Sequence, residues 1–262
     1  MYDMGTRERA LALMAQNRSL NSVSRETGIS RAAIRSWRIR SIPLRTIDCP
    51  RCQAVPEPPR NPTAYAYLLG LYLGDGCVSP LKRGVHSLRI ACAEAWPGLI
   101  DACAEAMRSV MPGNKVCQVR QQGCRQVTSY SKHWPCLFPQ HGPGKKHERP
   151  IVLEPWQRDI VDAHPWAFVR GLIHSDGCRV INWTTRTVGG ELRRYEYPRY
   201  FFTNRSDDIR GLFTAALDRV GVEWKRANAQ NISVARKASV ALMDLHVVRS
   251  TDPYFGLSSS AM

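Results

Sequence analysis

Residues 68–76 read LLGLYLGDG, and residues 169–177 of the same 262-residue chain read VRGLIHSDG. Each segment is an apolar run with small residues at its third and seventh positions and an Asp-Gly pair at its end. Small residues four positions apart lie on one face of a helix, where they allow a second helix to approach closely. The two segments therefore predict two helices, Tyr65–Gly74 and Trp166–Ser175, that pack directly against each other.

The ends of these helices predict a metal site. A proline near the start of each helix, Pro62 or Pro165, suits the first helical turn. The glycine after each aspartate suits the left-handed conformation that commonly ends a helix. Asp75 and Asp176 would then emerge together, and two carboxylates held close repel each other unless a cation lies between them. The alternative is a pair of core helices with incidental Asp-Gly turns, which the repetition disfavours.

Both segments resemble the LAGLIDADG motif of the homing endonuclease family, because the Gly, the Leu, the small residue and the Asp-Gly fall in register. The resemblance spans residues 62–248 and implies an α+β fold, a pseudo-twofold αββαββ repeat with two saddle-shaped antiparallel sheets that lie in the DNA major groove. It also implies that Asp75 and Asp176 bind Mg²⁺ and are catalytic. Leu73 and His174 replace an earlier acid of the motif, and Arg170 replaces a small residue.

The sequence after each motif supports a repeat. Hydrophobic patterns predict a strand, a helix and two strands in the first copy. They predict a hairpin around Gly189-Gly190, a helix, two strands and a last helix in the second copy. The expected strands are 85–91, 116–120, 126–131, 179–188, 194–203, 223–226 and 231–235, and the expected helices are 95–111, 208–220 and 238–247.

Two lysines occupy equivalent positions in the two copies, because segment 127–132 aligns with segment 232–237. These are Lys132 and Lys237. The resemblance implies that a basic residue there lies beside the scissile phosphate, where it would stabilise developing charge. The alternative is that both are solvated surface lysines.

The first 45 residues predict a separate three-helix unit, with helices at 7–16, 20–27 and 31–40. Gly28 provides a turn and Ser30 is a good N-cap for the third helix. This order is typical of helix-turn-helix DNA-binding domains, although any small three-helix bundle shares it. The third helix would be the recognition helix, and the outward residues suited to phosphate and guanine are Arg31, Arg35, Ser36 and Arg38.

A CxxC pair, Cys49 and Cys52, precedes a proline-rich linker that we expect to be stiff and extended. Such a pair is half of a zinc site. The sequence has no second CxxC pair, so zinc would need distant ligands at irregular spacing; otherwise the two thiols are simply reduced. The candidates for distant ligands are Cys124, Cys136, His141 and His147.

The composition favours a nucleic-acid partner. The chain has 37 basic and 22 acidic residues, a net charge of +15 and a pI of about 9.8, which suits double-stranded DNA. A basic loop at 142–149 would either contact phosphate or be solvated. The strand arginines expected to face DNA are Arg89, Arg120, Arg179, Arg186, Arg193 and Arg199. The sequence shows no signal peptide and no long apolar run, so we expect a cytoplasmic, nucleoid-associated monomer without membrane contact.

These patterns predict five segments: a helix-turn-helix domain (1–45), a CxxC knuckle and linker (46–61), two LAGLIDADG-like repeats (62–150 and 151–248) and a tail (249–262). Two functions are open. One is a site-specific double-stranded DNA endonuclease that uses Mg²⁺ to activate water. The other is a transcriptional regulator that binds DNA without cleaving it. WhiA-type regulators also join such a core to a helix-turn-helix, but theirs is C-terminal and their acids are lost, so the acids retained here favour the endonuclease.

Overall fold

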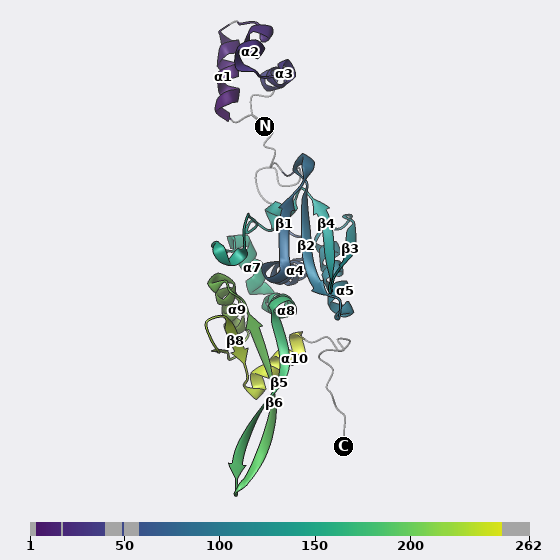
Figure 1. Cartoon of the computed structure of the whole chain (residues 1–262), viewed down its shortest axis with the longest axis vertical. Coiled ribbons are helices and arrows are strands. Elements are labelled where there is room, and N and C mark those ends of the chain that lie inside the picture. Colours follow the sequence, from purple (N-terminus) through teal and green to yellow (C-terminus); the bar gives the residue numbers. More distant parts are fainter. Residues whose placement is uncertain (1–3, 17, 40–48, 50–57, 248–262) are drawn as a thin grey trace. The chain divides into compact units, whose positions relative to one another are not determined.

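The computed structural model describes residues 4–16, 18–39, 49 and 58–247 (Figure 1). The chain divides into two compact units, Met1–Asp48 and Cys49–Met262, which we describe separately. The expected tail and most of the expected linker lie outside the described residues. In the part of the chain that is described, every helix is too short or too polar to cross a membrane.

The first unit has the three expected helices, which are α1 (Met4–Ala15), α2 (Leu20–Thr27) and α3 (Arg31–Ile39). Gly28 ends α2 with a φ of 69°, a left-handed conformation that glycine adopts without strain. The hydroxyl of Ser30 accepts a hydrogen bond from the backbone N–H of Ala33 at 3.3 Å, as an N-cap residue does. Among the described residues of this unit, the hydrophobic side chains buried in its core are Ala10, Val23, Ile29 and Ile34.

The second unit contains one αββαββ arrangement twice. The first copy consists of α4 (Pro62–Asp75), β1 (Gly76–Pro80), β2 (His86–Ala93), α5 (Pro97–Val110), β3 (Val116–Gln121) and β4 (Cys124–Ser131). The second consists of α8 (Pro165–Asp176), β5 (Gly177–Val188), β6 (Glu191–Thr203), α9 (Asp207–Arg219), β7 (Lys225–Arg226) and β8 (Asn231–Val234). The further elements are η1 (Lys82–Gly84), α6 (Trp134–Leu137), η2 (Lys146–Glu148), α7 (Pro155–Ala163) and α10 (Lys237–Val247).

The two sheets have the same topology. Both are four-stranded and antiparallel, with the orders β1-β2-β4-β3 and β5-β6-β8-β7. The expected α+β fold with an internal repeat is therefore confirmed. Strand β1 and helices α6 and α7 are elements that the sequence patterns did not predict.

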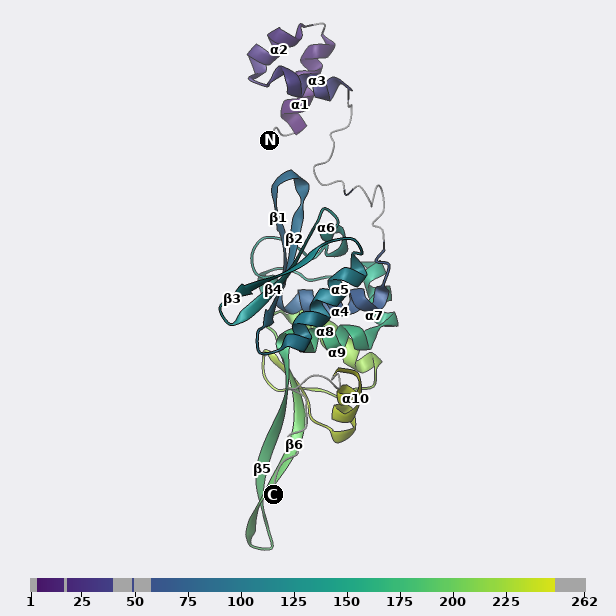
Figure 2. The same ribbon diagram turned by 90° about the vertical axis from the view of Figure 1, so that its right-hand side faces the viewer.

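Helices α4 and α8 pack against each other in the middle of this unit (Figure 2). Their contact depends on small residues. A Cβ atom added to Gly171 would lie 2.2 Å from the backbone oxygen of Tyr67, and one added to Gly70 would lie 2.6 Å from the backbone oxygen of Phe168. Because no real side chain tolerates such distances to a backbone atom, glycine at these positions sets the spacing of the helices. The expected direct contact is confirmed.

The expectation about the glycines at the helix ends was wrong. Both helices begin at their prolines, but Gly76 has a φ of −94° and Gly177 a φ of −109°, so neither is left-handed. Instead the chain passes from each helix straight into a strand. A Cβ atom at Gly76 would lie 2.5 Å from the Cα of Tyr72, and one at Gly177 would lie 2.7 Å from the Cα of Ile173. Glycine is needed at both positions because a side chain would collide with the preceding helix.

The β5–β6 hairpin is much longer than the rest of its sheet. Its turn is formed by Gly189 and Gly190, both with positive φ, as expected. Strand β6 pairs with β8 only from Tyr200 to Thr203. The remainder of the hairpin therefore extends away from the body of the unit as a two-stranded ribbon (Figure 1).

Candidate active site

Asp75 and Asp176 lie together, as expected, because they are the last residues of the two packed helices. A Cβ atom at Gly74 would lie 3.0 Å from Oδ2 of Asp176. Partial burial and the charge of Asp176 raise the pKa of Asp75 to about 6, although the Asp75 side chain still reaches solvent. Partial burial also raises the pKa of Asp176. Both shifts indicate that the protein environment disfavours the charged forms of the two aspartates.

Lys146, in η2, supplies a cation at this site that the sequence did not single out. Its Nζ donates hydrogen bonds to the backbone oxygens of Leu73 at 2.9 Å and Gly74 at 2.7 Å, and also to that of Tyr72. These carbonyls form the negative end of the α4 dipole. Burial lowers the pKa of Lys146 to about 8, while the charges of Asp176 and Asp75 oppose that shift.

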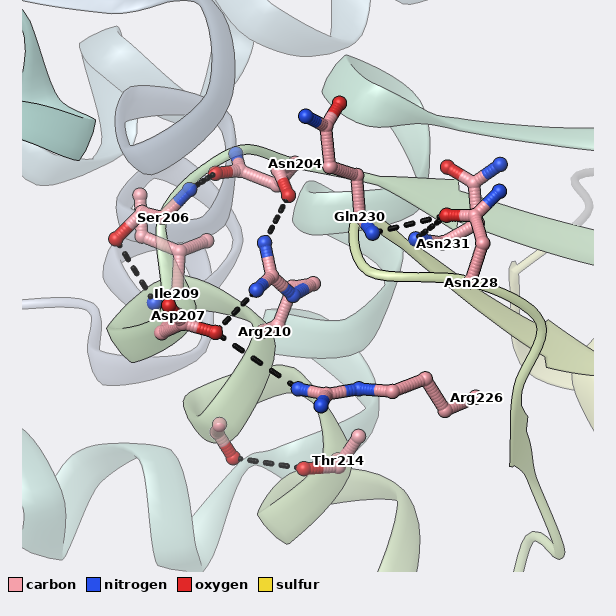
Figure 3. Close-up of polar contacts among 11 residues, drawn as sticks. Asn204, Ser206, Asp207, Ile209, Arg210, Thr214, Arg226, Asn228, Gln230 and Asn231 are labelled. Atoms are coloured by element: carbon pink, nitrogen blue, oxygen red, sulfur yellow. Dashed lines mark hydrogen bonds and ion pairs between the residues drawn. The ribbon is translucent and has the colours of Figure 1, made fainter.

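Asn204 binds the second aspartate and is itself held by a polar network at the start of α9 (Figure 3). Its Nδ2 donates to Oδ2 of Asp176 at 2.6 Å. Its Oδ1 accepts from the backbone N–H of Ser206 at 2.8 Å, which fixes the orientation of the amide. The guanidinium of Arg210 donates to the backbone oxygen of Asn204 and to Asp207. Asn204 is thus positioned to orient Asp176 and to lower its pKa.

A cavity of about 420 Å³ opens beside Asp176. One wall comes from the expected basic loop, whose shape depends on Arg149. The Arg149 guanidinium donates to the backbone oxygens of Gln140, Gly142, Pro143 and Gly144 at 2.8–3.1 Å. The loop is therefore structured rather than merely solvated, and its cavity suits an anionic ligand. The basic residues that line the cavity are Lys145, Lys146, His147, Arg149 and Arg205.

The structure places Lys132 and Lys237 on the surface. Lys132 follows β4 and Lys237 begins α10, and both side chains are exposed. The cavity beside Asp176 is lined by Lys146 instead. A role for Lys132 and Lys237 beside the scissile phosphate stays a prediction.

The strand arginines divide between two faces, because alternate residues of a strand point to opposite sides. Arg89 lies between the buried residues Leu88 and Ile90 and so points to the opposite face from them. By the same register Arg186, Arg193 and Arg199 share the face opposite the buried side chains of β6. These four arginines therefore point away from the core, and their contact with DNA stays a prediction.

Arg179 and Arg120 lie on the faces that carry the core. Arg179 pairs in register with buried Tyr200, and its guanidinium donates to both oxygens of Asp244 in α10 at 2.8 and 2.9 Å. Arg120 lies near the end of β3 and forms an ion pair with Glu94 at 3.0 Å. The Arg179 contact holds its sheet to α10, so we remove Arg179 from the DNA-facing set. The side chain of Arg120 is 76% exposed, and its contact with DNA stays a prediction. The sequence patterns failed for Arg179 because they did not give the strand register.

The projecting hairpin exposes aromatic as well as basic side chains. Trp183 is 55% exposed, and the guanidinium of Arg194 lies 5.0 Å from the centre of its ring. Arg186 and Arg193 are paired opposite each other near the tip. A two-stranded ribbon of this kind fits the major groove of DNA.

The expected recognition helix, α3, exposes Arg31, Arg35 and Arg38. Arg31 also donates to Oδ1 of Asn21 at 3.2 Å. The side chain of Ser36 lies outside the described residues. DNA contact by these residues stays a prediction.

The expected CxxC pair is only partly described, because Cys52 lies outside the described residues. Cys49 is buried, and its thiol meets His133 and Cys136. Of the distant ligands considered from the sequence, Cys136 is therefore close to Cys49. The others have neighbours elsewhere, namely Gln121 for Cys124, Phe138 for His141 and Glu148 for His147. His133 was missed.

No protein-family description and no curated protein matches this sequence. Among solved structures, the chain is similar to I-DmoI in complex with DNA and Mn, with 15% identity, a TM-score of 0.48, and coverage of 72% of this chain and 98% of that one. It is similar to the LAGLIDADG meganuclease I-AabMI bound to uncleaved DNA, with 12% identity, a TM-score of 0.44, and coverage of 72% and 85%. It is also similar to full-length DUF199/WhiA from Thermatoga maritima, with 11% identity, a TM-score of 0.44, and coverage of 74% and 58%.

Proposed function

We propose that this protein is a LAGLIDADG-type endonuclease that hydrolyses both strands of a specific DNA site with a divalent metal. The observation that carries the proposal is the meeting of Asp75 and Asp176, contributed by two copies of one motif. Each aspartate comes from the end of a helix in its own repeat, so the site has one carboxylate for each strand of the DNA. The repeated fold around them is the one that the motif implies.

The residues at the site fit a hard divalent cation. Carboxylate oxygens are the ligands that Mg²⁺ and Mn²⁺ prefer. Two carboxylates beside one lysine leave a net negative charge. Burial raises the pKa of both aspartates, and the charge of Asp176 adds to the shift of Asp75, so a bound cation would favour their charged forms. Asp75 and Asp176 would hold the metal, which supplies Lewis acidity and activates water when it is bound.

The chain's own residues would perform the other tasks. The outward arginines of both sheets and the long hairpin would bind phosphates and fix the register of the DNA. Lys146 would stabilise negative charge at the attacked phosphate, since its ammonium group already lies at the end of α4. Asn204 would keep Asp176 oriented. The three-helix unit would add a second DNA contact.

The second candidate is a DNA-binding regulator that does not cleave. Lys146 favours it, because an ammonium group beside the two aspartates partly relieves their repulsion without any metal. The added three-helix unit also suits a regulator. In either case the expected place of action is chromosomal DNA in the cytoplasm.

Selection of DNA from a random duplex pool separates the two candidates. Binding would be selected in Ca²⁺, which suits coordination without efficient catalysis, and the enriched DNA would then be incubated with Mg²⁺ or Mn²⁺. An endonuclease gives defined ends on both strands within the protected region. Protection without cutting in either metal favours the regulator.

A further inference from the structure

Three side chains of types that can bind metal meet at α6, and the proposed nuclease chemistry does not use them. The ligand atoms of Cys49, His133 and Cys136 all lie within 4.8 Å of one another. The Sγ of Cys49 is 3.2 Å from the Nδ1 of His133. Cys49 and His133 are each only 4% exposed. This is a compact, sheltered set of sulfur and nitrogen ligands.

The spacing of these atoms suits zinc. Zinc bonds of about 2.3 Å to sulfur and about 2.0 Å to nitrogen place tetrahedral ligand atoms roughly 3.5–3.8 Å apart. The distance of 3.2 Å between Cys49 Sγ and His133 Nδ1 and the upper limit of 4.8 Å for the other pairs lie on either side of these values, so small side-chain rotations suffice to close the site. Thiolate and imidazole together are also the ligand types that select zinc over magnesium or calcium.

The local structure holds two of the ligands in place. His133 precedes α6 and Cys136 lies three residues further on, which places both on one side of a single helical turn. The backbone N–H of His133 donates to the hydroxyl of Ser131 at 3.0 Å. Trp134 is fully buried and donates from Nε1 to the backbone oxygen of Ser129 at 3.1 Å. A ligand pair fixed by its surroundings binds metal without a large ordering cost.

A buried thiol–imidazole pair can also be a catalytic nucleophile, but Cys49 and His133 are each only 4% exposed, which disfavours attack on a substrate from solution. A simple hydrogen bond between Cys49 and His133 would not require a second thiol at the same place. We propose that Cys49, His133 and Cys136 bind a structural zinc ion. Each thiol would release its proton to solvent as it ligates, and His133 would bind through Nδ1 with its proton on Nε2.

This zinc ion would join distant parts of the sequence. Cys49 is the first residue of the second unit and lies 84 residues before His133. A metal bridge between them would fix the point at which the chain enters the two-repeat unit.

The test is metal analysis of the full-length chain purified from zinc-containing medium without chelator. We expect about one zinc ion per chain, as structural sites bind one. Cys136→Ser and the Cys49→Ser/Cys136→Ser double variant should lose it. Cys117→Ser is the matched control, because Cys117 lies in β3 outside this cluster, and it should keep the full amount. Circular dichroism of each variant shows whether it is folded.

Cobalt replacement keeps the proposal testable if the variants do not fold. The wild-type chain exchanged into Co²⁺ should show the visible bands of tetrahedral cobalt and a thiolate-to-cobalt charge-transfer band. Absence of both stoichiometric zinc and this cobalt spectrum would overturn the proposal. So would full retention of zinc by the folded double variant, an iron–sulfur absorption spectrum, or a disulfide between Cys49 and Cys136. DNA cleavage is not a readout, so this test does not depend on the proposed nuclease.

Discussion

Replacing Gly171 with alanine should destabilise the two-repeat unit strongly, even though alanine is the better helix former. The added Cβ would lie 2.2 Å from the backbone oxygen of Tyr67, while ordinary contact begins near 3.4 Å. The shortfall is about 1.2 Å, and a backbone oxygen within a packed helix cannot rotate away. Helices α4 and α8 would have to separate along their contact.

The expected magnitude follows from two opposing effects. Overpacking in a tight core typically costs about 1–3 kcal/mol and occasionally more, and this clash is at the severe end because it involves backbone. The gain in helix propensity from glycine to alanine is about 1 kcal/mol. We expect a net loss of about 2–3 kcal/mol in the free energy of unfolding, or a fall of about 4–12 °C in Tm for a chain of this size.

Gly211→Ala is the matched control. Gly211 lies inside α9, and a Cβ added there meets nothing within 4 Å. The same substitution should therefore raise stability by about 0.5–1 kcal/mol. Urea unfolding followed by tryptophan fluorescence would measure both variants. If Gly171→Ala is as stable as the wild type, the helices are not held at the spacing described, and the reasoning about the motif fails.

Four further predictions concern the site and the DNA contacts. Lys146→Gln removes three hydrogen bonds to the end of α4 and should lower the free energy of unfolding, measured in urea, by about 1–3 kcal/mol. The control Lys145→Gln, at an exposed position, should change it by less than about 0.5 kcal/mol. Equal effects of the two substitutions would contradict the placement of Lys146. In chelator, Asp75→Asn should be more stable than the wild type at pH 7, because the raised pKa of Asp75 means that folding disfavours its charged form. This advantage in the free energy of unfolding should shrink as pH falls through about 6 towards 4, since the folded wild type then binds the extra proton. A difference in stability that does not change with pH would refute this reasoning. DNA affinity should fall about a thousandfold or more between 50 and 200 mM salt, because a chain of net charge +15 that contacts many phosphates releases many counterions. Titration of labelled duplex with the protein measures this, and an affinity that does not change with salt would exclude extensive phosphate contact. Deleting residues 1–45 should weaken binding or change the selected site while circular dichroism shows the core folded, and an unchanged footprint would mean that the three-helix unit does not bind DNA.

The sequence predicted the fold well because the decisive signals were local. The two motif helices, their starting prolines and the Gly189-Gly190 hairpin depend on residues that are close in sequence. Strand β1 was missed because it is short and follows the helix without a turn. Its glycine looked like a helix cap, whereas the need for it comes from the crowding of Tyr72 against the strand.

The site was only partly predictable because its other groups are distant in sequence. Lys146 lies more than 70 residues from the carbonyls that it binds, and no spacing rule distinguishes it from Lys145. His133 became a candidate ligand only when the fold brought Cys49 to it. Arg179 was misplaced because its face depends on pairing with Tyr200, which strand patterns alone do not specify.

Strand-resolved cleavage of the selected DNA tests the central claim most directly. The duplex would be labelled on each strand and incubated in Mg²⁺ with the wild type, Asp75→Asn, Asp176→Asn and the control Asp101→Asn, whose side chain is exposed on α5. We predict that the wild type and the control cut both strands. The two site variants should bind the DNA and fail to produce the double-strand break, because each loses a charged ligand oxygen. Unimpaired cutting of both strands by either site variant would contradict the account.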